Sequence, residues 1–411
     1  MENVFDAIVI GAGPAGSTAA IVLAMAGWRV AVIEKQAFPR RKVCGECISA
    51  SNLPLLASLG ISKPLLAMAG PPLRQIALVC GDQMVRAPLP AYSDPAHQWG
   101  VAIGREQLDT LLLDQARHHG AEIFQPWLVC QVDGSPGKFR CRIRAKDTRE
   151  EQSLSAPLLI DAHGSWEPLE VLAGTLRTPH RSSDLLAFKA NFIGTQIEQS
   201  MLPVLSFPGG YGGMVVGEQA VATFAFCLRR DALARARQQY PSLSAAQAAA
   251  SWVMQDCSAA AAMLAGAEQH GKWLSVGPIR PGIRINQVQN AAFLVGNAAG
   301  EAHPIIGEGI SIAIQSAMLA ANILAPYHGD IEDAQLQALL QANYAKVWRR
   351  NFARRIRLSA VFAHAAMRPG MYRRVLPILI RYPALLSQFA RWCGKVQAGP
   401  KLDSSEQAIK Y

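Results

Sequence analysis

The sequence lacks the ligand spacing of a metal site. Only Cys44 and Cys47 form a Cys-x-x-Cys pair, and neither a second such pair nor a His pair with zinc spacing occurs among the 411 residues. Because a structural zinc site would need two further ligands, no metal is expected. The eight cysteines are irregularly spaced, which favours reduced thiols over a disulfide framework.

Targeting and membrane-spanning signals are also missing. No basic region, signal-peptide core or small-residue cleavage site precedes the apolar run that begins at Val4, so we expect a cytoplasmic protein. The longest apolar stretch, from Ile305 to Ala325, contains Glu308, Gln315 and Asn322. A membrane span is therefore not expected, and any membrane contact would be peripheral.

Acidic residues are absent from one long segment. Residues 334–402 hold 13 Lys or Arg and no Asp or Glu. This segment therefore accounts for more positive charge than the net +10 of the whole chain. Apolar side chains are interleaved with these cations at helical spacing, namely Trp348, Phe352, Leu376, Ile380 and Trp392.

This basic tail predicts amphipathic helices that dock on an acidic partner through residues 344–395. The partner would be an anionic membrane surface or an acidic carrier protein. The alternative is that the arginines pair with acids of the remaining chain, so that the tail is only a structural cover. Nucleic acid fits less well, because the rest of the chain is slightly acidic and carries no nucleic-acid motif.

The amino-terminal segment NVFDAIVIGAGPAGSTAAIVLAMAGWRVAVIEK predicts one βαβ unit. A strand over 7–10 leads into a glycine turn, a helix over 14–26 and a second strand that ends in an acid. Its glycines permit the turn, a close approach of a pyrophosphate and tight helix packing, while the acid would bind a ribose. The pattern does not separate NAD from FAD, and a glycine-tight turn with a surface acid is the alternative. The predicted dinucleotide contacts are Gly11, Gly13, Ala15, Gly16, Glu34 and Lys35.

Two later stretches, GREQLDTLLLDQA and AFLVGNAAGEAHPIIGEGISIAIQSAMLAANIL, resemble the flavoprotein family that includes geranylgeranyl reductases and single-component aromatic hydroxylases. The resemblance runs, with gaps, from Val4 to about Leu324. In the first stretch it implies that Arg105 lies near the flavin, whereas a solvated arginine is the alternative. In the second it implies a strand, a turn and a helix amino terminus facing the isoalloxazine. The contacts implied by the second stretch are Gly296, Asn297, Pro304, Gly307, Gly309 and Ile310.

The chain departs from the family at two positions. Asn297 stands where the family usually has Asp, but an amide oxygen still accepts a hydrogen bond. In LLIDAHGSWEP, Asp161 and His163 replace the first Gly and the Asp of a Gly-Ala-Asp-Gly pattern, which weakens the implied handling of nicotinamide. His163 and Gly164 are predicted to contact the cofactor, although a histidine beside a glycine turn is more often structural.

The stretch KVCGE resembles the Lys-Pro-Cys-Gly loop of geranylgeranyl reductases, which implies a loop over the flavin. Cys44 and Gly45 would line the pocket, and Arg41 with its neighbouring cations Arg40 and Lys42 would lie near cofactor phosphates. Cys44 is a candidate redox or proton-donating thiol, and inert packing is the alternative. A thioredoxin-like dithiol fits less well, because the motif lies in a glycine-containing loop.

Period-two segments between these motifs predict a sheet that roofs the flavin. Residues 73–90 indicate a hairpin with Gly81 and Asp82 in its turn, and residues 201–231 indicate further antiparallel strands. The Tyr-x-Trp-x-Phe-Pro pattern of the reductases and the Trp-x-Trp-x-Ile-Pro pattern of halogenating relatives are both absent. Tyr211 is the candidate to touch substrate, and a core tyrosine at a glycine-rich bend is the alternative.

Together these features predict an α/β protein: a Rossmann-like FAD-binding domain with an inserted antiparallel β-sheet substrate domain and a helical C-terminal tail. The predicted FAD-binding domain comprises residues 1–72, 100–172 and 276–330, the substrate domain 73–99 and 173–275, and the basic helical region 331–411.

The predicted function is that of an FAD-dependent oxidoreductase reduced by NAD(P)H that acts on a small apolar substrate. Oxygenation is placed ahead, mainly because monooxygenases are the broader class. Reduction of a carbon–carbon double bond is the first alternative, with Cys44 or Tyr211 as proton donor. A flavin-binding protein without turnover is the second, made less attractive by the pocket glycines in all three flavin segments.

Overall fold

The computed structural model describes residues 3–165, 179–285 and 292–393. Lys395 and the rest of the predicted tail after residue 393 lie outside the described residues, as do parts of the predicted domains at 166–178 and 286–291.

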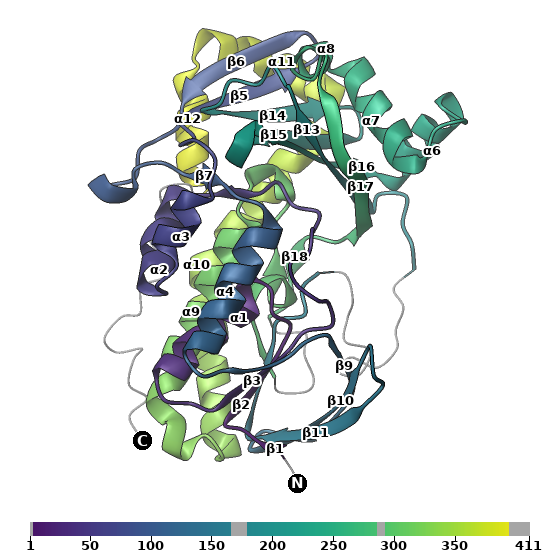
Figure 1. Cartoon of the computed structure of the whole chain (residues 1–411). Helices are drawn as coiled ribbons and strands as arrows, with labels where there is room; N and C mark the ends of the chain where they lie inside the picture. Colours follow the sequence, from purple (N-terminus) through teal and green to yellow (C-terminus); the bar gives the residue numbers. More distant parts are fainter. Residues whose placement is uncertain (1–2, 166–178, 286–291, 394–411) are drawn as a thin grey trace.

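The predicted βαβ unit is confirmed and belongs to a five-stranded parallel sheet (Figure 1). In spatial order its strands are β19 (Phe293–Leu294), β12 (Leu158–Asp161), β2 (Ala7–Ile10), β3 (Val30–Ile33) and β8 (Glu122–Phe124). The residues of β2 and β3 are all buried, as continuous apolar strands covered on both faces should be.

Helices and a small sheet cover the two faces of this parallel sheet. On one side α1 (Pro14–Met25) packs between α4 (Arg105–His118) and α9 (Gly309–Leu324). On the other side lies a four-stranded sheet whose core side chains contact Ile8 and Ile10. Its strands are β1 (Asn3–Val4), β11 (Glu151–Ala156), β10 (Lys138–Ala145) and β9 (Trp127–Ser135).

A seven-stranded sheet forms the other half of the molecule (Figure 1). In spatial order its strands are β17 (Glu268–Ile279), β13 (Leu185–Ile193), β16 (Ala222–Arg229), β15 (Gly210–Val216), β14 (Met201–Phe207), β5 (Gln75–Cys80) and β6 (Gln83–Pro88). The predicted hairpin is present as β5 and β6, with Gly81 at φ 64° in its turn. The pairing is antiparallel except between β5 and β14, which are parallel. The boundary predicted between residues 275 and 276 falls inside β17.

One face of the seven-stranded sheet is covered by α6 (Arg230–Gln239), α7 (Ala245–Asp256) and α8 (Ser258–Met263). Two short helices, α2 (Leu53–Ser58) and α3 (Ser62–Ala67), pack beside α4. Two short ladders complete the loops around the site: β4 (Cys47–Ile48) pairs with β7 (Val101–Ala102), and β18 (Gly282–Ile283) pairs with β20 (Gly300–Glu301).

The predicted helical tail is confirmed as α10 (Ala334–Ala366), α11 (Pro369–Arg381) and α12 (Ala384–Trp392). Asp333 caps α10 by accepting the backbone N–H groups of Gln335 and Leu336. In Figure 1 α10 passes from the parallel sheet toward the seven-stranded sheet, where α11 and α12 lie against β6. Two of the predicted docking residues are core residues instead: Trp348 and Phe352 are fully buried, since they lie on the inward face of α10.

Hydropathy alone would misplace α9. Within the part of the chain that the structure describes, the segment Gly309–Asp330 is the one helix that is long and apolar enough to cross a membrane. However, 72% of its apolar window is buried inside the protein. It is the central core helix of the half that contains the parallel sheet, in contact with α1 and α10.

Candidate active site

A cavity of about 520 Å³ joins the glycine-rich turns, the seven-stranded sheet and the last two helices. It brings together residues predicted from six separate stretches of sequence. The predicted residues that line it are Gly13, Ala15, Cys44, Gly45, Arg105, Gly164, Tyr211, Asn297, Pro304, Gly307, Gly309 and Ile310.

The glycines of the first turn divide into two roles. A Cβ atom on Gly11 (φ +98°) would lie 2.6 Å from the carbonyl oxygen of Ala162, and one on Gly16 would lie 1.7 Å from that of Gly11. Both glycines are therefore needed for the turn itself. A Cβ on Gly13 would instead meet only Arg105 Nη2, at 3.9 Å, and would project into the cavity.

Gly45 and Gly309 repeat the arrangement of Gly13. A Cβ on either would have no heavy atom within 4 Å, and both glycines line the cavity. Backbone from three distant segments is thus left bare toward one space. This is the cradle that a dinucleotide needs where its phosphates and ring approach main chain closely.

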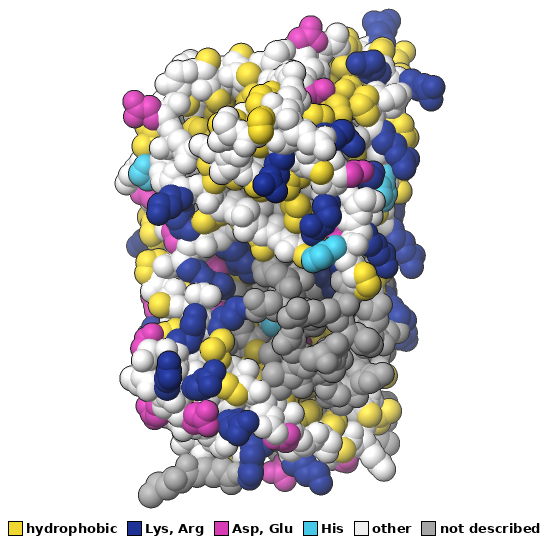
Figure 2. All heavy atoms as spheres, turned by 90° about the vertical axis from the view of Figure 1, so that its right-hand side faces the viewer, with side chains coloured by type: hydrophobic (Ala, Val, Ile, Leu, Met, Phe, Trp, Pro, Cys, Tyr) yellow, Lys and Arg dark blue, Asp and Glu magenta, His cyan; other side chains and the backbone are white. Residues whose placement is uncertain are grey.

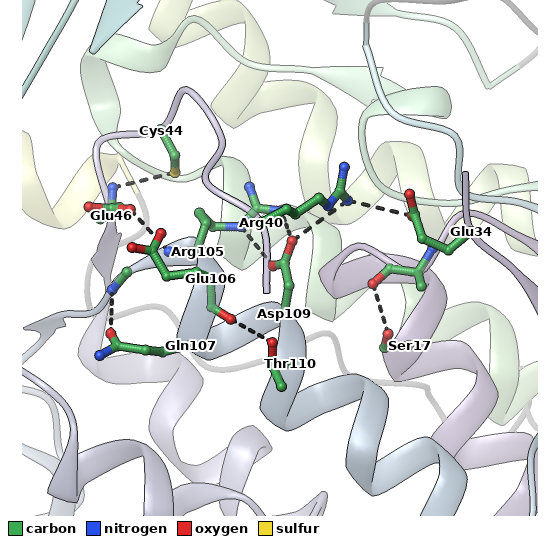
Figure 3. A network of polar contacts seen from close by, with 12 residues as sticks. Ser17, Glu34, Arg40, Cys44, Glu46, Arg105, Glu106, Gln107, Asp109 and Thr110 are labelled. Carbon is green, nitrogen blue, oxygen red and sulfur yellow. Dashed lines mark hydrogen bonds and ion pairs between the residues drawn. The ribbon is translucent and has the colours of Figure 1, made fainter. Parts of the chain in front are cut away.

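Charged side chains lie beside this cradle (Figure 3). Glu34 is 3% exposed and accepts the backbone N–H groups of Ala12 (3.0 Å) and Gln36 (2.8 Å). Arg40 Nη2 lies 3.5 Å from Glu34 and 3.7 Å from Asp109. Glu34 thus stands at the end of β3, where the acid for an adenosine ribose was predicted.

Arg105 is held in place by the carboxylate of Asp109. Its Nε and Nη2 donate to the two oxygens of Asp109, each at 2.8 Å, and the residue is 7% exposed. The alternative of a solvated arginine is therefore wrong. A fork-shaped contact of this kind fixes the guanidinium plane at the cavity wall.

The three adjacent cations at the start of the KVCGE loop, Arg40, Arg41 and Lys42, lie in different directions. Lys42 lines the cavity, and burial together with Arg105 and Arg40 lowers its pKa to about 8. Arg41 lies against β17 instead: its Nη1 is so close to Gly271 that a Cβ on that glycine would be 2.5 Å away. Within the described parts of the chain, the predicted cofactor residues that do not line the cavity are Gly11, Gly16, Glu34, Lys35, Arg41, His163 and Gly296.

The family departure at Asp161 and His163 forms a local pair. Asp161 is 3% exposed, its Oδ1 accepts the backbone N–H of His163 at 3.1 Å, and the same oxygen lies 2.6 Å from His163 Nδ1. A buried carboxylate of this kind needs these donors. The pair supports the structural interpretation of His163.

The turn before α9 carries the amide that replaces the family's Asp. Asn297 Nδ2 donates to Ser165 Oγ at 2.8 Å and to Glu301 Oε1 at 3.3 Å. Burial raises the pKa of Glu301, which also accepts from Arg284 Nη2 at 3.1 Å. Asn297 is thus oriented at the cavity wall by its neighbours.

Tyr211 is the polar side chain on the sheet side of the cavity that sequence reasoning identified. It is 1% exposed, and its hydroxyl lies 3.0 Å from Nδ1 of His303. Burial raises the pKa of Tyr211 well above its ordinary value, so the phenol stays protonated. Burial and the nearby His364 lower the pKa of His303 to about 4. The result is a neutral, hydrogen-bonded Tyr–His pair.

Comparison with known proteins identifies the dinucleotide. A family model described as "FAD binding domain" matches residues 4–349. The chain belongs to this FAD-binding family. The resemblance and the FAD prediction are confirmed, and the protein is an FAD-dependent oxidoreductase.

Relatives of this FAD-dependent oxidoreductase carry several activities. It is 26% identical to "Menaquinone reductase" of Mycolicibacterium smegmatis over 427 residues, which span 96% of this chain and 93% of the relative. The chondrochloren halogenase CndH of a myxobacterium has a TM-score of 0.75 and 19% identity, covering 98% of this chain and 95% of that one. A geranylgeranyl bacteriochlorophyll reductase-like protein of Thermoplasma acidophilum has a TM-score of 0.71 and 18% identity, with 99% and 95% covered. At these identities the two solved structures show the shared fold.

The residues present fit FAD. Gly13, Gly45 and Gly309 leave bare backbone on the cavity, and Gly309 and Ile310, which begin α9, place a helix amino terminus at the same space. FAD would lie between Gly13 and the amino terminus of α9, with Glu34 at its ribose. The individual contacts remain predictions.

The KVCGE loop of this flavoprotein is anchored by Glu46, which the sequence analysis did not identify as a site residue. Glu46 (φ 56°) is 5% exposed, forms an ion pair with fully buried Lys189 of β13, and accepts from Thr223 Oγ1 of β16 at 2.6 Å. It also accepts the backbone N–H of Arg105 at 3.0 Å. The loop is thereby tied to both halves of the molecule. A lysine within the apolar strand LLAFKANFI was the available signal.

The two loop cysteines, Cys44 and Cys47, are separate free thiols with different surroundings. Cys44 Sγ accepts the backbone N–H of Glu46 at 3.3 Å, whereas Cys47 begins β4 and is 8% exposed. Both line the cavity. Over residues 3–165, 179–285 and 292–393, no group of three or more His, Cys, Asp or Glu is arranged to hold a metal ion.

A second buried polar cluster, also missed, supports the amino terminus of α9. Glu308 is fully buried and accepts from Ser49 Oγ at 2.5 Å. Asn52 Nδ2 donates to Ser311 Oγ at 2.6 Å, and Asn52 Oδ1 accepts from Gln315 Nε2 at 3.1 Å. These contacts join the loop after β4 to α9, so the turn that faces the flavin space is braced from behind.

Proposed function

We propose that this FAD-dependent oxidoreductase reduces a carbon–carbon double bond in a lipophilic, polyprenyl-like substrate, with NAD(P)H as the source of electrons. The observation that carries the proposal is the course of the cavity. It continues from Cys44 and Gly309, past Tyr211, to apolar side chains of α11 and α12 such as Leu376 and Leu386. An extended apolar chain matches such a space better than a compact polar molecule does.

The comparisons give this proposal further support. The menaquinone reductase relative aligns along nearly the whole of both chains. The chain lacks the Trp-x-Trp-x-Ile-Pro pattern of halogenating relatives, and Asp161 and His163 replace the hydroxylase pattern. These points reverse the order of the two chemistries expected from sequence.

Tyr211 would act as the proton donor. The chemistry that FAD would supply when bound and reduced is hydride for one carbon of the double bond, so the protein would have to supply a proton for the neighbouring carbon. The buried hydroxyl of Tyr211 stays protonated at neutral pH and lines the cavity. His303, 3.0 Å away, is placed to relay a proton to the phenolate. Its neutral ring would give one proton from Nδ1 as the other ring nitrogen takes one up from solvent, to which the neighbouring His364 is exposed.

Lys42 and Arg105 would bind and orient the cofactor. Both line the cavity, and Arg105 is held by Asp109 on its own helix. Positive charge at this wall stabilises phosphate oxygens and a negatively charged reduced ring. Apolar walls on the sheet side exclude water from the reacting atoms.

Monooxygenation is the second candidate. The observation in its favour is the same exclusion of water, because an apolar enclosure protects an oxygenated flavin from breakdown. In that case Tyr211 would position the substrate by a hydrogen bond.

Single-turnover chemistry separates the two candidates. The holoenzyme is reduced without oxygen and mixed with a polyprenyl quinone or a polyprenyl alcohol in detergent. After any quinol has been reoxidised in air, a product whose polyprenyl chain has gained two hydrogens and no oxygen supports the proposal, whereas reduction of the quinone ring alone would overturn it. A product formed only after oxygen is added, with one oxygen atom gained and a transient flavin hydroperoxide absorbance, would overturn it in favour of monooxygenation.

Variants test the donor. Tyr211→Phe should lower the rate of product formation about a hundredfold while flavin reduction by NAD(P)H is unchanged. Tyr240→Phe, which alters a tyrosine hydroxyl bonded to Gln255 on the surface, is the matched control. Loss of product in Cys44→Ser but not in Tyr211→Phe would assign the proton to the thiol instead.

A further inference from the structure

The outer surface of α11 and α12 exposes large apolar side chains. Ile378 and Ile380 are each 52% exposed, and Tyr382, in the turn between the two helices, is 58% exposed. Neighbouring apolar residues are exposed as well, namely Met371, Val375, Leu385 and Trp392. Single exposed apolar residues are common, but seven of them on two adjoining helices and the turn between them indicate an interaction surface.

Several of these residues also mark the mouth of the cavity. Met371, Val375, Leu385 and Trp392 line the cavity and at the same time expose between 41% and 53% of their surface. A side chain can do both only at an opening. The cavity that holds Tyr211 therefore opens between α11 and α12.

The charged side chains of α11 and α12 are all positive, although Asp256 of α7 lies close enough to Arg373 to interact with it. Arg373, Arg374, Arg381 and Arg391 are exposed, and residues 334–402 contain no acid. Among the described residues, none of these four arginines takes part in an ion pair. The face shown in Figure 2 differs, since there Lys and Arg are mixed with Asp and Glu.

We propose that α11 and α12 dock on an anionic membrane surface, so that a lipophilic substrate enters the cavity directly from the bilayer. The entry step rests on the proposed function, whereas the docking does not. Aliphatic and aromatic side chains flanked by arginines are what an interfacial helix requires. An acidic carrier protein would satisfy the arginines but would leave Ile378 and Ile380 in water, and for this reason the bilayer is the favoured partner.

Vesicle sedimentation tests the docking. The holoenzyme is mixed with phosphatidylcholine vesicles or with vesicles that also contain phosphatidylglycerol, at low and high salt. We expect binding to the anionic vesicles that weakens as salt rises. Absence of binding to anionic vesicles at low salt would overturn the proposal.

Paired variants locate the surface. Ile378→Asp and Arg374→Glu/Arg381→Glu should each weaken anionic-vesicle binding about tenfold or more. The matched controls are Leu339→Asp, 51% exposed near the start of α10, and Arg142→Glu/Arg144→Glu on the exposed face of β10. Equal losses in test and control variants would contradict a localised docking surface.

Two further results would assign the surface to other partners. Self-association without vesicles that Ile378→Asp abolishes would make it an interface between two copies of the chain. Salt-sensitive binding to an acidic carrier protein with none to vesicles would make it a carrier site. Either result overturns the membrane proposal.

Activity separates this inference from the proposed function. None of the substituted residues lines the cavity. The docking variants should therefore keep parental activity on a short-chain substrate in solution and lose activity on substrate embedded in anionic vesicles. Vesicle binding without reduction of either substrate would count against the proposed function alone.

Discussion

At the inner end of the cavity, buried polar side chains from distant parts of the chain bind one another, whereas at its outer end α11 and α12 expose apolar side chains beside cations. Glu46 has Lys189 and Thr223 as partners, and Glu308 has Ser49. Ile378 and Ile380 are about half exposed. The polar side chains named at the inner end have their partners within the chain. The apolar side chains at the outer end are left to solvent, as on a surface that a membrane would cover.

The difference has an energetic consequence. Removing the partner of a buried charge lowers the free energy of unfolding by about 3 to 5 kcal/mol, because the remaining charge is left without compensation and cannot reach water. A substitution on an exposed surface usually changes stability by less than about 0.5 kcal/mol. Substitutions at the inner end should therefore change folding and cofactor binding, and those of exposed side chains at the outer end should change association alone.

The largest expected effect is loss of the cofactor from Gly13→Leu. Its side chain would project into the space left bare beside Arg105, so the protein should fold but purify without flavin absorbance. Gly16→Leu is the informative control, because its Cβ would lie 1.7 Å from the Gly11 carbonyl oxygen and should prevent the turn from forming. Absorbance spectra and circular dichroism distinguish the two outcomes. Stoichiometric FAD in Gly13→Leu would show that the cofactor lies elsewhere.

Removal of the loop anchor should have the next largest effect. Glu46→Ala leaves the ammonium of fully buried Lys189 without its carboxylate, and we expect a loss of about 3 to 5 kcal/mol in the free energy of unfolding. The matched control is Glu198→Ala, which breaks the exposed Arg86–Glu198 pair (2.7 Å) and should cost at most about 1 kcal/mol. Urea titration measures both. Similar losses of stability in the two variants would contradict the expected difference between buried and exposed ion pairs.

A double substitution sharpens this test. Glu46→Ala/Lys189→Met removes both charges and should recover part of the stability lost by Glu46→Ala. No recovery would indicate that Glu46 acts mainly through Thr223 and the amino terminus of α4.

The part of the site that sequence predicted is local in the chain. The turn around Gly11, Gly13 and Gly16 lies within a single βαβ unit, and its spacing reflects one turn and one helix end. The partners of Glu46 and Glu308 are 143, 177 and 259 residues away. No periodicity or motif connects positions so far apart, since only the packing of one half on the other brings them together.

The misplacement of Trp348 and Phe352 on the predicted docking surface has a related cause. Helical spacing identified the apolar residues of 344–395 but not the direction in which each one faces. Trp348 lies against Gly300 in the core, where a Cβ on that glycine would be 2.5 Å from the indole ring, while Trp392 is 53% exposed. Amphipathicity predicts that a buried face exists, and the neighbouring elements decide what buries it.

The buried His303 should make stability depend on pH. Its pKa is lowered to about 4 by burial and by His364, whereas a histidine in the unfolded chain has a pKa near 6.5. Between these values the unfolded state binds more protons, so stability should fall as pH decreases from about 6.5 to about 4, by about 3 kcal/mol in all.

Substitution isolates the contribution of His303. His303→Gln keeps a polar group near Tyr211 and should flatten the dependence over that pH range, whereas His118→Gln on the exposed end of α4 should leave it unchanged. Urea titrations at several pH values give the slope. An unchanged slope in His303→Gln would show that another group titrates there.

The smallest effect is expected at the outer end, and a pair of residues on one helix tests it. Leu376 is 7% exposed and packs against β5 and β6 side chains, while Ile378, two residues later, is 52% exposed. Leu376→Ala should cost about 2 to 3 kcal/mol, because it removes buried methyl groups and leaves a cavity. Ile378→Ala should change the free energy of unfolding by less than about 0.5 kcal/mol, because its side chain is already largely in water. Thermal unfolding of both variants measures the difference, and a cost for Ile378→Ala as large as that for Leu376→Ala would mean that the chain itself covers this surface.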